Sequence, residues 1–147
     1  MKNKNKGFTL VELLAVITVL GILTMIAVPN VLSTINNNKK NSFLMDAKRM
    51  VAKASELIAS NKDDRNLAKS SGKTYTFADL NQKDEFSNDA DGGSFDSNNT
   101  YVKITFSDNS FKYCIKVVGS KRSIKDKTTS NCIDSSNLTG IEVVIDN

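Results

Sequence analysis

The 147-residue sequence contains no histidine, no tryptophan, one proline and two cysteines. The absence of histidine removes the commonest general base and metal ligand, and with it every Ser–His or Cys–His nucleophile pair. The two cysteines, Cys114 and Cys132, do not by themselves complete a tetrahedral zinc site. We therefore expect a protein that is not an enzyme and that carries neither a metal nor a cofactor.

Positive charge is in slight excess, and most of the excess lies at the N-terminus. The formal net charge is +4, and three of the 20 basic residues are Lys2, Lys4 and Lys6, which leaves 17 basic against 16 acidic residues in the rest of the chain. No aromatic residues are interleaved with a lysine or arginine cluster, so nucleic acid is not indicated as a partner. The densest basic segment, 121–127, is typical of a solvated loop.

A long apolar segment follows the basic start. From Phe8 to Val28 the sequence has 21 residues and a single charge, Glu12. A helix of about 20 apolar residues spans the hydrocarbon core of a bilayer, and preceding lysines favour a cytoplasmic N-terminus. A secretory signal peptide has a shorter apolar core with a small-residue cleavage site after it, whereas this run continues to Pro29 without one. We therefore expect the run to be retained as a membrane helix.

A second helical pattern occupies the segment 33–61. Apolar residues recur at steps of three and four, with charged residues between them: Phe43, Leu44, Ala47, Met50, Val51, Ala54, Leu57 and Ile58. This pattern predicts that the apolar helix continues as an amphipathic helix to Asn61, with one face available for docking.

Beyond Asn99 the apolar residues alternate with a period of two. The segments 101–106 and 111–117 predict a β-hairpin around residues 107–110, and 141–145 predicts a last strand. Residues 74–77 fit a short strand or a turn, and the rest of 62–100 is expected to be loop. The expected fold class is α+β, a long N-terminal helix packed on a small antiparallel sheet.

The junction between the basic start and the apolar run reads Lys6-Gly7-Phe8-Thr9-Leu10-Val11-Glu12. With the basic leader before it and the unbroken apolar run after it, this segment resembles the cleavage motif of type IV prepilins and of the related pseudopilins. The resemblance in sequence covers residues 1–32, and the expected helix-plus-sheet layout agrees with the same family over the rest.

The resemblance implies a processing and assembly route. A prepilin peptidase would cut after Gly7, and Phe8 would become the N-methylated first residue of the mature chain. Glu12, a costly charge in an apolar span, would pair in a filament with the N-terminal amine of a neighbouring subunit. Pro29 lacks a backbone N–H and Gly21 adds backbone freedom, so the helix is expected to unwind locally between them, as filaments of this family often do.

The same resemblance divides the chain into four parts and gives it a function. The parts are a cleaved leader (1–7), a membrane and filament-core helix (8–32), an amphipathic helix (33–61) and a globular domain (62–147). A major type IV pilin of the Gram-positive type is the class it resembles most. Such a subunit passes from the cytoplasmic membrane into a homopolymeric surface filament for adhesion, motility or aggregation, with the assembly machinery and minor pilins as further partners.

Two alternatives stay open. A pseudopilin of a secretion or competence machine would share the N-terminal segment and differ in the globular part. A single-pass signal-anchor protein whose outer domain binds a ligand without polymerising would need neither Gly7 nor Glu12.

Two further features bear on the globular part. Strand alternation places Cys114 on the face opposite the expected helix, and Cys132 lies in a segment that has to return to the sheet. An exported pair of cysteines favours a bridge, and the family often has one in this region, so a disulfide is expected. In the segment 87–98, Asp89 and Asp91 fit a calcium loop, but Ser87 and Asn98 stand where carboxylates are required, which predicts a solvated turn.

Overall fold

The computed structural model describes residues 8–139 and 143–145. By its internal contacts the chain divides into two compact units, Met1–Asn37 and Asn38–Asn147. Gly7 and the first two residues of the predicted 141–145 strand lie outside the described residues.

A single helix, α1 (Leu10–Ser60), belongs to both units. It contains all but two of the described residues of the first unit, and it is the first element of the second unit. The sequence favours a helix over this length because neither the apolar run nor the amphipathic segment contains a turn signal stronger than Pro29, which lies inside the helix. In the first unit every described residue is exposed. The long helix predicted from two successive patterns is therefore confirmed.

In the second unit α1 buries the predicted apolar stripe. The residues of α1 that are buried are Phe43, Leu44, Ala47, Met50, Ala54 and Ile58, and Val51 and Leu57 pack beside them partly exposed. Removing an aliphatic or aromatic side chain from water stabilises a fold by about 1.5–3 kcal/mol, so this stripe is a main source of cohesion for a unit with a small core.

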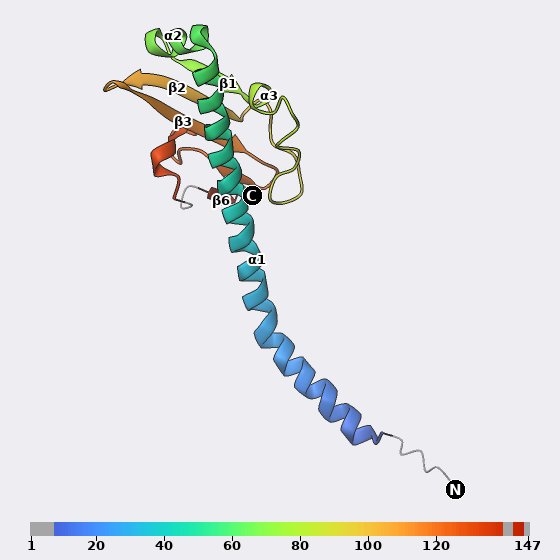
Figure 1. Cartoon of the computed structure of the whole chain (residues 1–147). Helices are drawn as coiled ribbons and strands as arrows, with labels where there is room; N and C mark the ends of the chain where they lie inside the picture. The colour runs from blue at the N-terminus through green and yellow to red at the C-terminus, as the bar shows by residue number, and fades with distance from the viewer. Residues whose placement is uncertain (1–7, 140–142, 146–147) are drawn as a thin grey trace. The chain divides into compact units, whose positions relative to one another are not determined.

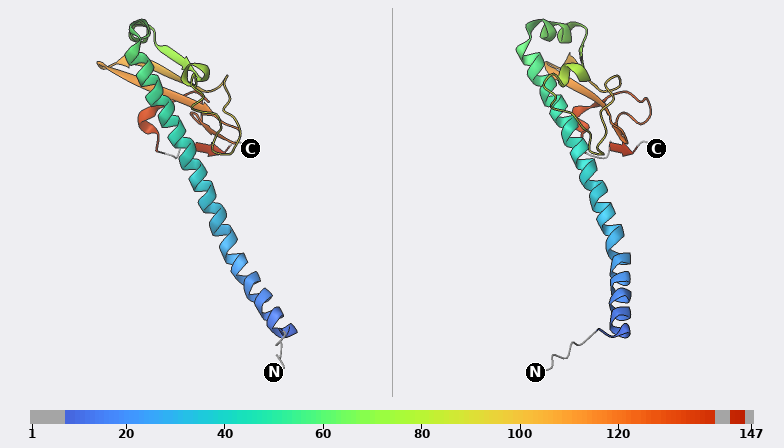
Figure 2. Two further views of the ribbon diagram at one scale, coloured as in Figure 1. Left: turned by 45° about the vertical axis from the view of Figure 1, so that its right-hand side comes forward. Right: turned by 90° about the vertical axis from the view of Figure 1, so that its right-hand side faces the viewer.

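The sheet of the second unit is antiparallel and lies against this stripe (Figures 1 and 2). Its strands are β1 (Lys73–Thr76), β2 (Tyr101–Ser107), β3 (Ser110–Val118), β4 (Arg122–Ile124), β5 (Ile133–Asp134) and β6 (Val143–Ile145). The order is β1-β2-β3-β4-β6, with β5 paired to β3 beside β4. The predicted α+β class is confirmed, with more strands than the sequence patterns indicated.

The alternation in β2 and β3 decides which side chains meet α1. Val102 and Ile104 on β2 and Ile115 and Val117 on β3 are fully buried in the same core as the α1 stripe. On the same side of β3, the hydroxyl of Tyr113 donates a hydrogen bond to Ser55 Oγ of α1 across 3.1 Å. The predicted period of two therefore identified the core face of the sheet correctly.

The hairpin between β2 and β3 turns through two residues. Asp108 and Asn109 have φ values of 50° and 60°, the left-handed conformation that both central residues of a type I′ turn require. Aspartate and asparagine tolerate this conformation better than other residues with a side chain. The register that follows pairs Phe106 with Phe111, whose rings meet edge to face at 5.1 Å.

The prediction of a loop between the helix and the hairpin is wrong in two places. Helix α2 (Lys62–Ser70) starts at the N-cap Asn61, whose side-chain oxygen accepts hydrogen bonds from the N–H groups of Asp63 and Asp64. The short helix α3 (Phe77–Leu80) begins with a capping box formed by Thr76 and Asp79. Both starts carry a recognisable cap, but the helices are too short and polar for a periodic apolar pattern.

The prediction of a solvated loop for 121–127 is wrong for its middle three residues. Residues Arg122–Ile124 form β4, and all three are buried. The strand pairs with β3 on one side and with β6 on the other, so it lies inside the sheet. A second short element that the sequence did not indicate, the 3-10 helix η1 (Ser135–Asn137), follows β5.

Candidate functional site

The segment Phe8–Glu12 begins the described chain and carries the residues of the predicted processing site. Phe8 is 87% exposed and precedes the helix, which begins at Leu10. The predicted cleavage position, Gly7, lies outside the described residues. Cleavage after Gly7 and methylation of Phe8 therefore stay predictions.

Thr9 and Glu12 form a reciprocal cap at the start of α1. The backbone N–H and the hydroxyl of Thr9 both donate to Glu12 Oε2, at 2.9 and 2.8 Å. The N–H of Glu12 in turn donates to Thr9 Oγ1 at 3.3 Å. This is the capping-box arrangement, in which a threonine N-cap and a glutamate three residues later satisfy each other's backbone donors. The Thr-x-x-Glu spacing was visible in the sequence, but its role was missed.

The cap fixes where the only carboxylate of the apolar segment lies. All of these hydrogen bonds to the Glu12 carboxylate use Oε2, and Oε1 accepts none from the described residues. Glu12 also stands in the first turn, where the partial positive charge of the helix N-terminus favours an anion. The carboxylate is thus held by its own chain through one oxygen, and the other oxygen has no hydrogen-bond donor among the described residues.

The helix surface from Phe8 to Ile35 is exposed and predominantly apolar. The large apolar side chains on it are Phe8, Leu10, Val11, Leu13, Leu14, Val16, Ile17, Val19, Leu20, Ile22, Leu23, Met25, Ile26, Val28, Val31, Leu32 and Ile35. By length and composition the helix is able to cross a membrane. An exposed apolar surface of this extent marks a contact with lipid or with other protein.

Thr18 and Thr24, in the middle of this surface, do not interrupt it. Thr18 Oγ1 donates to the carbonyl of Leu14 at 2.8 Å, and Thr24 Oγ1 donates to the carbonyl of Leu20 at 2.7 Å. Both hydroxyls are therefore satisfied within the helix, which is how serine and threonine are accommodated in a medium without water.

Gly21 and Pro29 are both helical in the single chain. Pro29 provides no N–H for the carbonyl of Met25, while one residue along the side-chain amide of Asn30 donates to the carbonyl of Ile26 at 3.2 Å. A methyl group added at Gly21 would meet no atom within 4 Å. The predicted unwinding concerns the assembled filament and stays a prediction.

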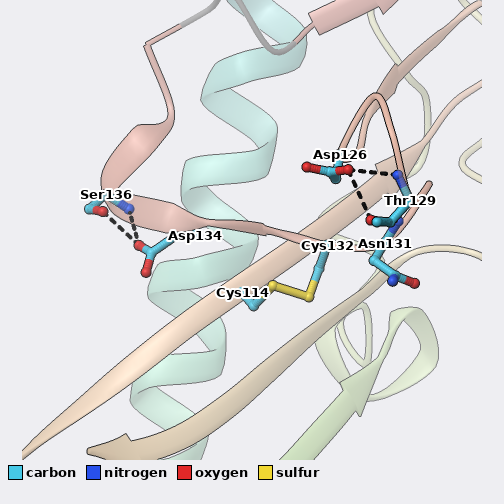
Figure 3. The surroundings of a disulfide bond; sticks show 7 residues. All are labelled: Cys114, Asp126, Thr129, Asn131, Cys132, Asp134 and Ser136. Carbon is cyan, nitrogen blue, oxygen red and sulfur yellow. Dashed lines mark hydrogen bonds between the residues drawn. A yellow bond between two sulfur atoms is a disulfide. The ribbon is translucent and has the colours of Figure 1, made fainter.

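Cys114 and Cys132 are bonded to each other, with their Cα atoms 5.4 Å apart (Figure 3). The register explains the proximity, because Cys114 pairs with Asp134 on β5 and Cys132 lies two residues before Asp134. The bridge closes the segment that contains β4 and the turn at Asp126, whose carboxylate accepts hydrogen bonds from Thr128 and Thr129. It ties that segment to the middle of the sheet.

The segment 87–98 consists of turns, as expected, but the expectation that it is solvated is wrong for Asp89 and Asp91, whose carboxylates are bound within the second unit. Asp89 is buried, its Oδ1 accepts the N–H groups of Asp91 and Gly93 at 2.9 Å each, and its Oδ2 accepts the N–H of Ser120. A sequence pattern reports acidic residues but not the distant donors that fold back onto them.

Asp91 is held by two cations from separate elements. Its carboxylate lies 2.7 Å from Arg122 Nε of β4 and 3.2 Å from Lys39 Nζ of α1, and the side chains of Asp91 and Arg122 are each 5% exposed. Burial disfavours the charged form, but the hydrogen bonds from Arg122 and Lys39 outweigh it and lower the pKa of Asp91. Among the described residues no group of acidic or cysteine ligands suited to a metal is present.

Comparison with known proteins identifies the N-terminal segment. Residues 2–28 match the family model of the prokaryotic N-terminal methylation motif. No curated protein and no solved structure matches the chain. The matched residues include the Phe8–Glu12 segment and most of the exposed apolar surface of α1. The motif and the helix-plus-sheet fold indicate a structural, non-enzymatic protein, and the motif indicates a type IV prepilin-like protein.

Proposed function

We propose that this chain is a subunit of a type IV pilus, cut after Gly7 by a prepilin peptidase, methylated on Phe8 and polymerised through α1. The observation that carries the proposal is the methylation motif at residues 2–28, which includes the first 19 residues of the exposed apolar helix. Before assembly the subunit is anchored in the cytoplasmic membrane, and afterwards it belongs to a surface filament that serves adhesion, motility or aggregation.

The apolar surface of α1 supports a subunit that is first anchored in the membrane and is later assembled into a filament. A surface with this many exposed aliphatic side chains is stable in lipid and unstable in water. A subunit that leaves the membrane must therefore bury the surface again, and identical helices from neighbouring subunits offer an equally apolar environment. Polymerisation through this helix replaces lipid contacts with protein contacts.

Pairing through Glu12 fixes the position of each subunit along the filament axis. The Oε2 of Glu12 is bound by Thr9 of the same chain, and its Oε1 accepts no hydrogen bond from the described residues. The N-terminal amine of a processed neighbour is a cation of the size and charge that this oxygen accepts. Pairing the two charges removes the penalty of leaving either one alone among apolar helices. A subunit shifted along the filament axis would leave both charges unpaired.

Features of the second unit favour a pilus subunit over a pseudopilin of a secretion machine. A disulfide ties the C-terminal part of that unit to its sheet. The loop carboxylates that a calcium site would need, Asp89 and Asp91, are bound to the protein's own N–H groups and to Arg122 and Lys39. Such a unit is stabilised without an ion, which suits exposure on a filament.

Assembly is tested by replacing Glu12 in cells that carry no other copy of the subunit. Glu12→Gln keeps the shape of the side chain and removes its charge, so processing should continue while the yield of filaments sheared from the surface falls at least tenfold. Glu56→Gln is the matched control, since Glu56 lies on α1 with its side chain 70% exposed and pairs with Lys53. Filament yield from Glu12→Gln equal to that of the control would contradict assembly through this carboxylate.

A further inference from the structure

Residues 33–38 of α1 lack both of the surroundings that support the rest of the helix. The apolar residues 8–28 form a helix long enough, at about 30 Å, to fill the hydrocarbon core of a bilayer. At the other end, Phe43 is the first residue of α1 that the core of the second unit buries. Every residue of the 33–38 stretch is exposed. The helical conformation of this stretch therefore depends on its own sequence.

That sequence is a poor one for a helix in water. The stretch contains no alanine, glutamate, lysine or leucine, and it reads Ser33-Thr34-Ile35-Asn36-Asn37-Asn38. Serine, threonine and asparagine are weaker helix formers than those residues, because their side chains compete for backbone hydrogen bonds. The hydroxyl of Thr34 makes such a bond, donating to the carbonyl of Asn30 at 2.9 Å, and bonds of this kind weaken and bend helices.

The three consecutive asparagines also favour a break in the helix. Breaking a helix is costly because backbone N–H and C=O groups on each side of the break lose their partners. Asparagine is among the best N-cap residues, since its side-chain oxygen accepts from the first N–H groups of a helix. It also adopts the left-handed conformation that closes a helix at its C-terminus. A break within 36–38 therefore supplies a suitable residue to both new ends.

Lys39 limits how far such a break extends into the second unit. Its Nζ lies 3.2 Å from Asp91 Oδ1, and the Asp91 carboxylate is also bound by Arg122. The side chains of Asp91 and Arg122 are each 5% exposed, so Lys39 is tied to an interior ion pair. The division of the chain into two units falls between Asn37 and Asn38, directly before this anchor.

We propose that the 33–38 stretch is a hinge, at which α1 opens into two helices while the membrane segment and the second unit keep their structures. The open hinge lets the second unit turn while the apolar helix stays in the bilayer. This inference rests on the membrane-anchored stage of the proposed function and is independent of polymerisation. It differs from the unwinding expected between Gly21 and Pro29, which concerns the assembled filament.

Amide hydrogen exchange of the full chain in non-ionic micelles, followed by NMR, tests the hinge. Amides of residues 35–38 should exchange at least ~100-fold faster than those of Ala47 and Ala54, which the core buries. Replacing Asn36, Asn37 and Asn38 together by alanine should slow the exchange of 35–38 roughly 20-fold, because strong helix formers replace weak ones. Replacing all three by serine, a similarly weak helix former and an equally good N-cap, should preserve the fast exchange.

Asn66→Ala is the matched control, since it makes the same substitution at an exposed position of α2 and should leave the exchange of 35–38 unchanged. Wild-type amides at 35–38 that exchange as slowly as those of Ala47 and Ala54 would overturn the hinge. So would a triple alanine variant that exchanges like the wild type. A triple serine variant as slow as the triple alanine variant would overturn the role of these side chains.

The turning of the second unit is measured in lipid nanodiscs by amide relaxation. The wild-type second unit should tumble with a shorter correlation time than the disc, and the triple alanine variant should lengthen that time. Equal correlation times in the two chains would overturn the hinge. Neither measurement involves a filament, so a chain that opens at 33–38 and never polymerises would contradict the filament proposal alone.

Discussion

Asp91 accepts a hydrogen bond from Arg122 Nε across 2.7 Å, although 31 positions separate the two residues. The same carboxylate accepts one from Lys39 of α1 at 3.2 Å. One aspartate therefore joins the loop between α3 and β2 to the sheet and to the helix near the first residues of the second unit. Both ends of the Asp91–Arg122 pair fall in segments whose composition predicted solvated loops.

Replacing Asp91 tests how much this junction contributes to stability. Removing one partner of a buried ion pair leaves the other charge uncompensated, and Asp91→Asn should lower the free energy of unfolding by roughly 3 kcal/mol. The measurement is urea unfolding of the full chain in micelles. Asp108→Asn in the hairpin turn is the control, since it changes the same charge in an exposed turn. Equal unfolding midpoints for the two variants would contradict a stabilising role for the pair.

Stability should fall in acid. Burial opposes the ionised form of Asp89 and Asp91, but hydrogen bonds from Ser120, Gly93 and Arg122 outweigh it, so both pKa values are lowered in the folded chain. Their contribution is present above the ordinary aspartate pKa of about 3.9 and is lost as the pH falls below it. The contribution of Asp46 to stability changes with pH in the opposite direction, because burial raises the pKa of Asp46 and its protonation favours the folded chain.

The measurement is the unfolding midpoint as a function of pH. The wild-type chain should lose stability steeply below pH ~4, and Asp91→Asn should show a shallower decline because one of the carboxylates with a lowered pKa is missing. A pH profile of Asp91→Asn as steep as that of the wild type would show that other carboxylates carry the acid dependence.

Gly119 is expected to tolerate no side chain. A Cβ atom at this position would lie 2.7 Å from Phe43 Cε2 of α1 and 2.7 Å from Asp89 Oδ2. Gly119→Ala should therefore destabilise the chain by about 1–3 kcal/mol, the usual consequence of overpacking a core. Gly21→Ala is the matched control, because its added methyl group meets nothing within 4 Å. A Gly119→Ala chain that unfolds at the wild-type urea concentration would refute the close packing.

The disulfide predicts a simple labelling result. In the unreduced, unfolded chain no thiol should react, and two should react after reduction, because Cys114 and Cys132 are the only cysteines. Reduction should destabilise the second unit by roughly 3 kcal/mol, the chain-entropy value for a loop of this size. Two reactive thiols before reduction would rule out the bridge in the protein as produced by the cell.

The elements predicted correctly from sequence were those with a periodic apolar pattern. The stripe on α1 and the alternation in β2 and β3 have enough apolar residues to define a period. Helix α2 has only Leu67 and Ala68 among nine residues, and β4 has three residues, so neither sets a period. Their positions depend on caps and on distant strands instead, which a local pattern does not report.

The residues of the candidate site divide in the same way, into local patterns that the sequence reveals and distant contacts that it does not. The junction from Gly7 to Glu12 was found because its residues are contiguous and specific in combination. The cap that Thr9 forms with Glu12 was equally local, and the Thr-x-x-Glu spacing would have predicted it. The Asp91 junction depends on Arg122, which reaches it only because β4 lies inside the sheet.

Intact-mass spectrometry of the chain, extracted from membranes and from sheared surface material, tests the central claim most directly. The account predicts one mature species in both fractions, beginning at Phe8 and carrying a methyl group on its N-terminus. Gly7→Val should remain in the membrane fraction with residues 1–7 attached, because the peptidase must approach the backbone at this position. A wild-type chain that begins at Met1 in every fraction would contradict processing at Gly7 and, with it, the assignment of the chain as a pilus subunit.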